Sequence, residues 1–141
     1  MKKSLRRITI PIIAAAASLA LATTPAFAYD NSMHTDDTDP GGVVYWTNNG
    51  DKLEVCDIEK DGYGVHVGIS WSYNYDGPYT DAYYINQTAG NGTCGYRDAG
   101  DGGVYNIPEG TYVWVWIALK KGDKIDTDTR DDSVWLNPRL S

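Results

Sequence analysis

The stretch TYVWVWIALKK carries the side chains of this chain that are best suited to binding chemistry. Read as a β-strand, it places aliphatic residues on one face and Tyr112, Trp114 and Trp116 on the other, because successive side chains of a strand point to opposite faces. Aromatic rings two residues apart form a flat row that stacks on sugar rings or anchors a protein partner. The sequence therefore predicts a ligand-binding surface at these three residues.

A structural interpretation of the two tryptophans stays open beside this one. The segment 65–73 alternates between large apolar residues and the small face that contains Gly68 and Ser70. If this strand neighbours the aromatic one, the indoles cover the glycine, which is a known use of aromatic side chains in sheets. The sequence alone does not choose between cover and binding row.

Three tyrosines in the segment SYNYDGPY make a second candidate binding surface. Tyr73, Tyr75 and Tyr79 surround a turn centred on Gly77 and Pro78. Tyrosine beside Asn and Gly on a loop is typical of antibody-like binding surfaces. The alternative is that these rings pack on the strands that flank their own turn.

Carboxylates in the segment DTDTRDD form a candidate calcium site at Asp126, Asp128 and Asp132. Two Asp residues separated by one position occur in calcium-binding loops, although the Gly and Glu of an EF-hand are absent here. The alternative is a solvated acidic surface with Asp-Gly turns. We expect no other cofactor. Looser candidate sites are Asp57 and Asp61 before Gly62, and Asp98 and Asp101 before Gly102.

Catalytic motifs are not recognisable in this sequence, and we expect a protein that is not an enzyme. There is no nucleophile elbow, zincin helix or phosphate-binding Gly-Lys loop. His66 lies on the outward face of its predicted strand, and His34 lies in a polar N-terminal segment. Acidic residues are plentiful, but abundance does not make the paired geometry of a glycosidase.

The two cysteines, Cys56 and Cys94, predict one disulfide. An even cysteine count in an exported chain is typical of disulfide bonding. The bond would close a loop of 39 residues counted inclusively, which stabilises the fold by about 4 kcal/mol on the chain-entropy argument. A metal site would need more Cys or His ligands at close spacing.

Residues 1–28 have the three parts of a secretory signal peptide. Four Lys and Arg residues precede an apolar Ala-rich run, and the segment ends in Ala26-Phe27-Ala28. We expect cleavage after Ala28 and a secreted, extracellular protein with no membrane attachment after cleavage. The remaining chain has 8 basic and 19 acidic residues, a formal charge of −11. Nucleic acid is therefore not an expected partner, because it requires basic surface.

The elements that position these residues are short strands with a period of two. Residues 29–42 are acidic and polar without a period, and we expect a flexible leader there. Residues 43–141 contain about seven short strands separated by turn signals. We therefore predict an all-β protein, a single immunoglobulin-like β-sandwich with one disulfide.

Three segments of this domain resemble a group of small exported proteins of actinobacteria. The segments are GDKLEVCDIEKDGYGVHVGI, then GTC, then NIPEGTYVWVWIA before the long aromatic strand. The resemblance covers about residues 50–119 and implies a secreted, disulfide-bonded β domain. It implies no activity and no catalytic residues.

The sequence thus favours a secreted, non-catalytic binding module. Its expected partner is extracellular carbohydrate or cell-wall polymer, bound through the Trp and Tyr face. The alternatives are a protein-interaction domain, such as a secreted inhibitor or adhesin, and a structural protein of the cell envelope or spore surface.

Overall fold

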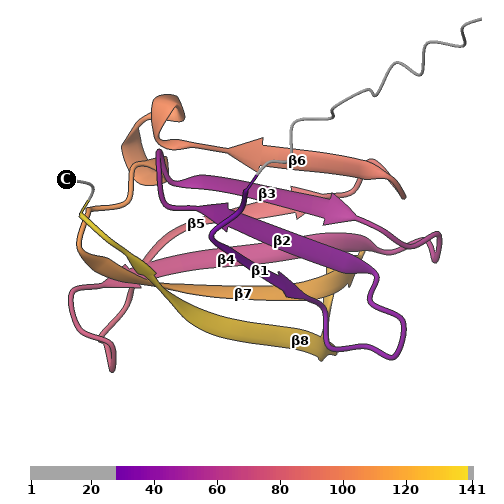
Figure 1. Cartoon of the computed structure of the whole chain (residues 1–141). Helices are drawn as coiled ribbons and strands as arrows, with labels where there is room; N and C mark the ends of the chain where they lie inside the picture. The colour runs from indigo at the N-terminus through magenta and orange to yellow at the C-terminus, as the bar shows by residue number, and fades with distance from the viewer. Residues whose placement is uncertain (1–27, 140–141) are drawn as a thin grey trace, which may run out of the picture.

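The computed structural model describes residues 28–139, which form two antiparallel sheets packed face to face (Figure 1). One sheet has the strand order β1-β2-β3-β6 and the other β5-β4-β7-β8. Two short 3₁₀ turns, η1 and η2, join β6 to β7. Within the described residues, no helix is long and apolar enough to span a membrane. The strands are β1 (Asn31–His34), β2 (Gly42–Thr47), β3 (Lys52–Asp57), β4 (Gly64–Ser72), β5 (Thr80–Gln87), β6 (Thr93–Arg97), β7 (Thr111–Lys121) and β8 (Lys124–Asn137), and the turns are η1 (Ala99–Asp101) and η2 (Gly103–Tyr105).

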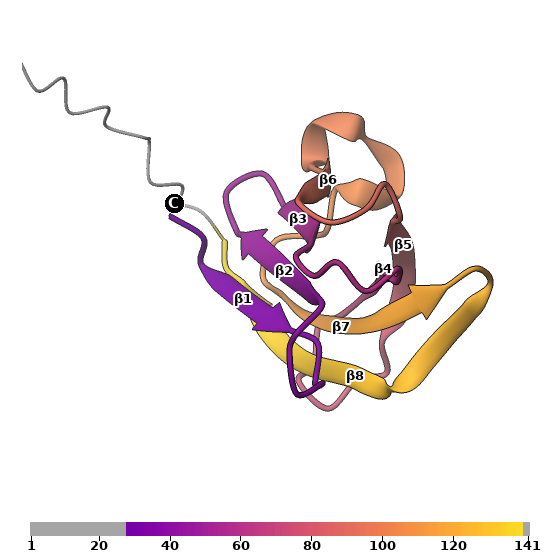
Figure 2. The same cartoon turned by 90° about the vertical axis from the view of Figure 1, so that its right-hand side faces the viewer.

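The predicted all-β sandwich with one disulfide is confirmed, with eight strands where the sequence predicted about seven. Strands β2, β3 and β6 form one sheet, and strands β5, β4, β7 and β8 form the sheet that faces it. Strand β1 adds an eighth strand at the edge of the sheet of β2, β3 and β6. Both sheets then have four strands, and we call the β1-β2-β3-β6 sheet the smaller one because its strands are shorter. The β7–β8 hairpin projects beyond the rest of the sandwich, as Figure 2 shows.

The prediction of a flexible leader over residues 29–42 is wrong for the part that forms β1. Residues Asn31–His34 pair antiparallel with β2, and Met33 is buried in the core. Asp30 also donates its backbone N–H to the Trp46 carbonyl oxygen at 2.9 Å. The free backbone N–H and C=O groups at the edge of β2 offer this segment hydrogen-bond partners. Pairing with them orders the segment despite the polar composition from which we predicted flexibility. The predicted signal peptide lies almost wholly outside the described residues.

The core lies between the two sheets and is built by alternation. On β4, Val65, Val67 and Ile69 face inward, as their spacing predicts, and all three are buried. The inward face of β7 meets them across the β4–β7 register. Aliphatic burial of this kind stabilises the fold by about 25 cal/mol per Å² of apolar surface. The fully buried large side chains are Trp46, Leu53, Ile69, Ile107, Ile117, Val43, Val44, Val55, Val65, Val67, Val113 and Val115.

The predicted disulfide joins Cys56 and Cys94, which are directly paired residues on the adjacent strands β3 and β6. Their Cα atoms are 4.0 Å apart. Both sulfur atoms lie on the outer face of the smaller sheet, since Val55 and Leu53 take the inward positions of β3. In antibody domains the corresponding disulfide joins the two sheets. Here the bond instead fixes the register of β6 on β3.

A buried carboxylate joins three distant parts of the chain at the other end of the sandwich. Asp51, in the β2–β3 turn, is 1% exposed. It accepts the backbone N–H of Ile107 at 2.9 Å and the side-chain amide of Asn137 at 3.0 Å. Burial raises the pKa of Asp51, while these two hydrogen bonds act in the opposite direction. Asp51 thereby connects the β2–β3 turn to the segment before β7 and to the end of β8.

Removing this carboxylate should destabilise the fold. In Asp51→Ala, the donors on Ile107 and Asn137 lose their partner inside the protein, and alanine must adopt the positive φ of 49° at this position. We expect a loss of about 2–4 kcal/mol in the free energy of unfolding, measured by urea denaturation. Asp123→Ala, in the exposed β7–β8 turn, is the control. Equal stability of the two variants would contradict this role of Asp51.

Candidate functional site

The outer surface of the β5-β4-β7-β8 sheet carries a continuous group of aromatic side chains, which we call the aromatic face. No described segment packs over it as a further layer (Figures 1 and 2). It is built from alternate positions of β4, β5 and β7, with contributions from the β4–β5 loop and from β8. Its members are His66, Tyr75, Tyr79, Tyr84, Tyr112, Trp114, Trp116 and Arg130.

Trp116 lies across Gly68 of the neighbouring strand β4, its direct partner in the β4–β7 register. A Cβ added to Gly68 would lie only 2.8 Å from Cζ2 of Trp116, and closer still to Nε1. The glycine is therefore required by the close approach of the indole. The structural interpretation of the tryptophans is correct for this residue. The same indole remains half-buried rather than enclosed, so it also forms part of the outer surface.

Trp114 is fixed by polar contacts on β8. Its indole Nε1 donates to Asp132 Oδ2 at 2.9 Å. The guanidinium carbon of Arg130 lies 5.4 Å from the Trp114 ring centroid and 4.7 Å from that of Trp116. A cation in this position is attracted by both ring systems. Arg130 thus holds the two indoles in a defined arrangement and covers part of their surface.

His66 links the aromatic face to a polar group on its edge. Its ring lies 5.0 Å from that of Trp116 and stacks on Tyr84 at 5.5 Å between centroids. Nδ1 donates to Asn86 Oδ1 at 2.6 Å, and the Lys120 ammonium donates to the same oxygen at 3.0 Å. Burial lowers the pKa of His66; the hydrogen bond to Asn86 raises it and the charge of Lys120 lowers it further. The net direction is down, which favours a neutral imidazole at pH 7.

The structure brings two of the three loop tyrosines to this surface. Tyr75 meets Tyr112 edge to face at 5.5 Å, and the ring of Tyr79 lies 6.0 Å from that of Trp114. Tyr79 is also held by its hydroxyl, which donates to the Tyr75 carbonyl oxygen at 2.6 Å. Tyr73 instead packs against Trp71, whose side chain faces the core, and it does not join the aromatic face.

The structure does not bring the carboxylates of Asp126, Asp128 and Asp132, the candidate calcium ligands, within 4.8 Å of one another. These residues belong to the long strand β8 rather than to a loop, although β8 bulges where the register shifts. Asp126 Oδ1 accepts a hydrogen bond from the backbone N–H of Asp128, and Asp132 Oδ2 accepts one from the indole N–H of Trp114. Among the described residues, the three ligand-type side chains that come close enough for a metal are Glu54, Cys56 and Cys94, and the two sulfurs are in the disulfide.

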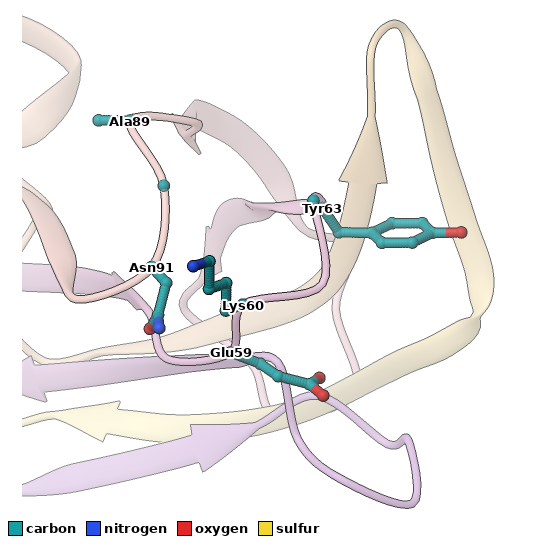
Figure 3. A pocket seen from close by; sticks show the side chains of 7 residues that line it. Glu59, Lys60, Tyr63, Ala89 and Asn91 are labelled. Carbon is teal, nitrogen blue, oxygen red and sulfur yellow. The ribbon is translucent and has the colours of Figure 1, made fainter.

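Two hollows lie away from the aromatic face. One is formed by the β3–β4 loop and the β5–β6 turn, and it is lined by Glu59, Lys60, Gly62, Tyr63, Ala89, Gly90 and Asn91 (Figure 3). The Tyr63 ring points away from this hollow, and the Lys121 ammonium lies 4.8 Å from its centroid. The other lies on the outer face of the smaller sheet, near Tyr29, Glu54 and Tyr96. Neither contains an arrangement of nucleophile and base.

Comparisons with known protein families, with curated proteins and with solved structures find no match to this chain. The aromatic face is therefore interpreted from its own geometry.

Three members of the aromatic face were not among the predicted site residues. The alternation of β4 places His66 outward, but its stacking on Tyr84 depends on β5 being the next strand. Arg130 lies in the acidic segment that we interpreted as a calcium loop, and only the pairing of β8 with β7 brings it over the tryptophans. For all three residues, the period of two in the sequence predicts which side chains point outward. It does not predict which strands are neighbours, and therefore does not predict that these side chains meet.

Replacing Gly68 tests the contact that fixes Trp116. In Gly68→Ala, the new methyl group overlaps the indole, so Trp116 must move away from the sheet. We expect a loss of about 1–3 kcal/mol in the free energy of unfolding and a red shift of the tryptophan fluorescence. Gly95→Ala on β6 is the matched control, since its Cβ would meet only the flexible end of Gln87. An unchanged spectrum and stability in Gly68→Ala would contradict the contact.

The charge of Lys120 should influence the titration of His66. Because this charge lowers the pKa of His66, Lys120→Met should raise it toward the ordinary value of 6.5. The wild-type imidazole should titrate below 6.5, and the stability that the neutral ring contributes is present above 6.5 and is lost as the pH falls through the lowered pKa. NMR titration of the imidazole protons measures both values. A higher pKa in the wild type than in the variant would contradict the assignment.

Proposed function

We propose that this protein is a non-catalytic extracellular binding module whose aromatic face binds neutral carbohydrate, such as a cell-wall or extracellular polysaccharide. The observation that carries the proposal is the row formed by Tyr112, Trp114 and Trp116 on the outer face of β7, over which no described segment packs as a further layer. Successive members of the row are about 7 Å apart along the strand. A row of this kind offers stacking positions to successive sugar rings of an extended chain.

The apolar rings are accompanied by the polar groups that sugar hydroxyls require. Asp81 accepts the Ser70 hydroxyl at 2.8 Å and keeps a second carboxylate oxygen for other donors. Asp132 lies beside Trp114 in the same way. Asn86 and Lys120 are at the opposite end of the row, beside His66. Flat apolar surface with a few convergent polar groups is the usual composition of a small-molecule or glycan site.

The charge of the chain restricts the class of ligand. With a formal charge of −11 after residue 28, the domain repels polyanions such as teichoic acid or sulfated glycans. On the aromatic face itself, Arg130 and Lys120 are balanced by Asp81 and Asp132. A neutral polysaccharide meets no net electrostatic penalty at such a surface.

A protein partner is the second candidate, and one observation favours it. Arg130 lies over both tryptophans, and the combination of Trp, Tyr and Arg is typical of the residues that dominate protein–protein binding energy. Tyr75 at 60% exposure and Leu136 at 51% would extend such an interface. For carbohydrate stacking, in contrast, the guanidinium occupies part of the ring surface that the sugar needs.

Sedimentation of the protein with insoluble chitin, cellulose and bacterial cell wall tests the proposal. The wild-type protein should bind at least one of these polymers, and Trp114→Ala should weaken that binding by at least about tenfold, because stacked rings contribute about 1 kcal/mol or more each beyond their burial. Arg130→Ala should bind neutral polymer as well as or better than the wild type, since the indoles become more accessible.

Tyr96→Ala serves as the control, since Tyr96 is 61% exposed on the opposite sheet and should not affect binding. Circular dichroism establishes that each variant is folded. Failure of the folded wild type to bind any of the polymers would overturn the carbohydrate proposal. That failure would favour the protein-partner alternative. A loss of polymer binding in Arg130→Ala equal to that in Trp114→Ala would instead contradict the view that Arg130 covers ring surface that the sugar needs.

A further inference from the structure

The outer face of the smaller sheet carries a carboxylate between two aromatic side chains. Glu54 on β3 is the direct partner of Tyr45 on β2 and of Tyr96 on β6 (Figure 1). Directly opposed residues of antiparallel strands point to the same face, with Cβ atoms about 5 Å apart. Because Leu53 and Val55 take the inward positions of β3, Glu54 points outward. The three side chains therefore form a row across the outer face.

Tyr29 completes this group from the N-terminal side. Its ring stacks on Tyr45 with 4.3 Å between the ring centroids, and its hydroxyl donates to Glu54 Oε2. The hydrogen bond to Glu54 is the main cause that raises the pKa of Tyr29 to about 12, so at neutral pH the phenol is protonated and acts as a donor. The expected cleavage after Ala28 leaves Tyr29 in the chain.

The other carboxylate oxygen of Glu54 is available to a ligand. Oε1 lies 3.9 Å from Cys56 Sγ, which belongs to the disulfide and has no proton to donate. Glu54 lines a hollow of about 570 Å³, which is within the usual size range of ligand sites. We call it the Glu54 hollow. Its lining includes Tyr29, Glu54, Cys94, Gly95, Tyr96 and Asp98.

The charges around the Glu54 hollow favour a cation. Its lining contains two carboxylates, Glu54 and Asp98, and one ammonium, that of Lys52. The Lys52 side chain runs toward the β2–β3 turn, since its Cε lies 3.7 Å from the position of a Cβ added to Gly50. Asp98 is held in place by capping η1, where its Oδ1 accepts the Gly100 N–H at 2.7 Å. The formal charge of −11 after residue 28 attracts cations and repels anions at longer range.

The aromatic part of the lining selects among cations. The Tyr96 side chain is 61% exposed beside Glu54, so the face of its ring is accessible. A guanidinium group can stack on an aromatic ring and donate to a carboxylate at the same time, because it is planar and its N–H donors lie along its edge. A lysine ammonium is a compact, strongly hydrated charge that gains less from the ring. An arginine side chain therefore matches the hollow better than a lysine side chain does.

We propose that the Glu54 hollow binds an arginine side chain of an extracellular peptide or protein, with the guanidinium on Glu54 Oε1 and against the ring of Tyr96. Among the described residues β6 is the edge strand of its sheet, so the backbone of a partner can pass beside the hollow while its side chain enters. The hollow and the aromatic face lie on opposite sheets, and the arginine site does not depend on the proposed function. For one side chain at an exposed site we expect a dissociation constant on the order of 1 mM, and an affinity that falls as salt is added.

Titration of the ¹⁵N-labelled protein with a blocked Gly-Arg-Gly peptide tests the site by NMR. The matched probe is the same peptide with citrulline in place of arginine, which keeps the planar shape without the charge. The arginine peptide should shift the backbone N–H signals of Glu54, Gly95 and Tyr96. It should bind at least about tenfold more tightly than the citrulline peptide, because the ion pair and the cation–π contact both require the charge. Free arginine, whose own carboxylate is repelled by Glu54 and Asp98, should bind more weakly than the blocked peptide.

Glu54→Gln should weaken binding of the arginine peptide at least about tenfold, because it removes the charge but keeps the size of the side chain and an oxygen for the Tyr29 hydroxyl. Tyr96→Ala should weaken binding about two- to fivefold through the loss of the ring face. This second variant changes an exposed residue and keeps the test open if Glu54→Gln does not fold. Glu109→Gln, which removes an exposed carboxylate in the segment before β7, is the matched control and should bind as the wild type does.

Equal binding of the arginine and citrulline peptides, or the absence of shifts at the hollow, would overturn the proposal. So would full affinity in folded Glu54→Gln or Tyr96→Ala, an equal loss in Glu109→Gln, or tighter binding of free arginine than of the blocked peptide.

Discussion

Trp116 lies across Gly68 because the glycine has no side chain to keep the indole away from the sheet. Both faces of β7 are apolar, although only one of them faces the core. The contact with Gly68 explains how the aromatic residues of the other face are accommodated. The inner face seals the core through Val113, Val115 and Ile117. No segment among residues 28–139 forms a second layer over the outer face, so the aromatic side chains cover the small residues of β4 themselves. The remaining members of the aromatic face are arranged around this packed indole.

An aromatic face built in this way is rigid. The rings of β7 are fixed by the strand backbone, by Gly68 and by Arg130, and only Tyr75 and Tyr79 come from a loop. Little side-chain entropy is therefore lost when a ligand binds, which favours affinity for a repetitive polymer.

The period of two in the sequence was enough to predict the sandwich and the burial of Val65 and Ile69, and the pair of cysteines in a chain expected to be exported was enough to predict the disulfide. The same period did not predict the elements whose formation depends on a neighbouring strand. Strand β1 is short and polar, and it forms because β2 offers an edge. The acidic segment of β8 has poor strand propensity, and its pairing with β7 overrides that preference. Arg130 joins the aromatic face for the same reason.

The indole N–H signals of the tryptophans provide the most direct test of the central claim that the aromatic face binds carbohydrate. A ¹⁵N-labelled protein would be titrated with soluble chito- and cello-oligosaccharides and with soluble cell-wall fragments. The account predicts that the signals of Trp114 and Trp116 shift together while that of the core residue Trp46 does not move. Shifts confined to Trp46, or unchanged signals of Trp114 and Trp116 with every sugar tested, would contradict it.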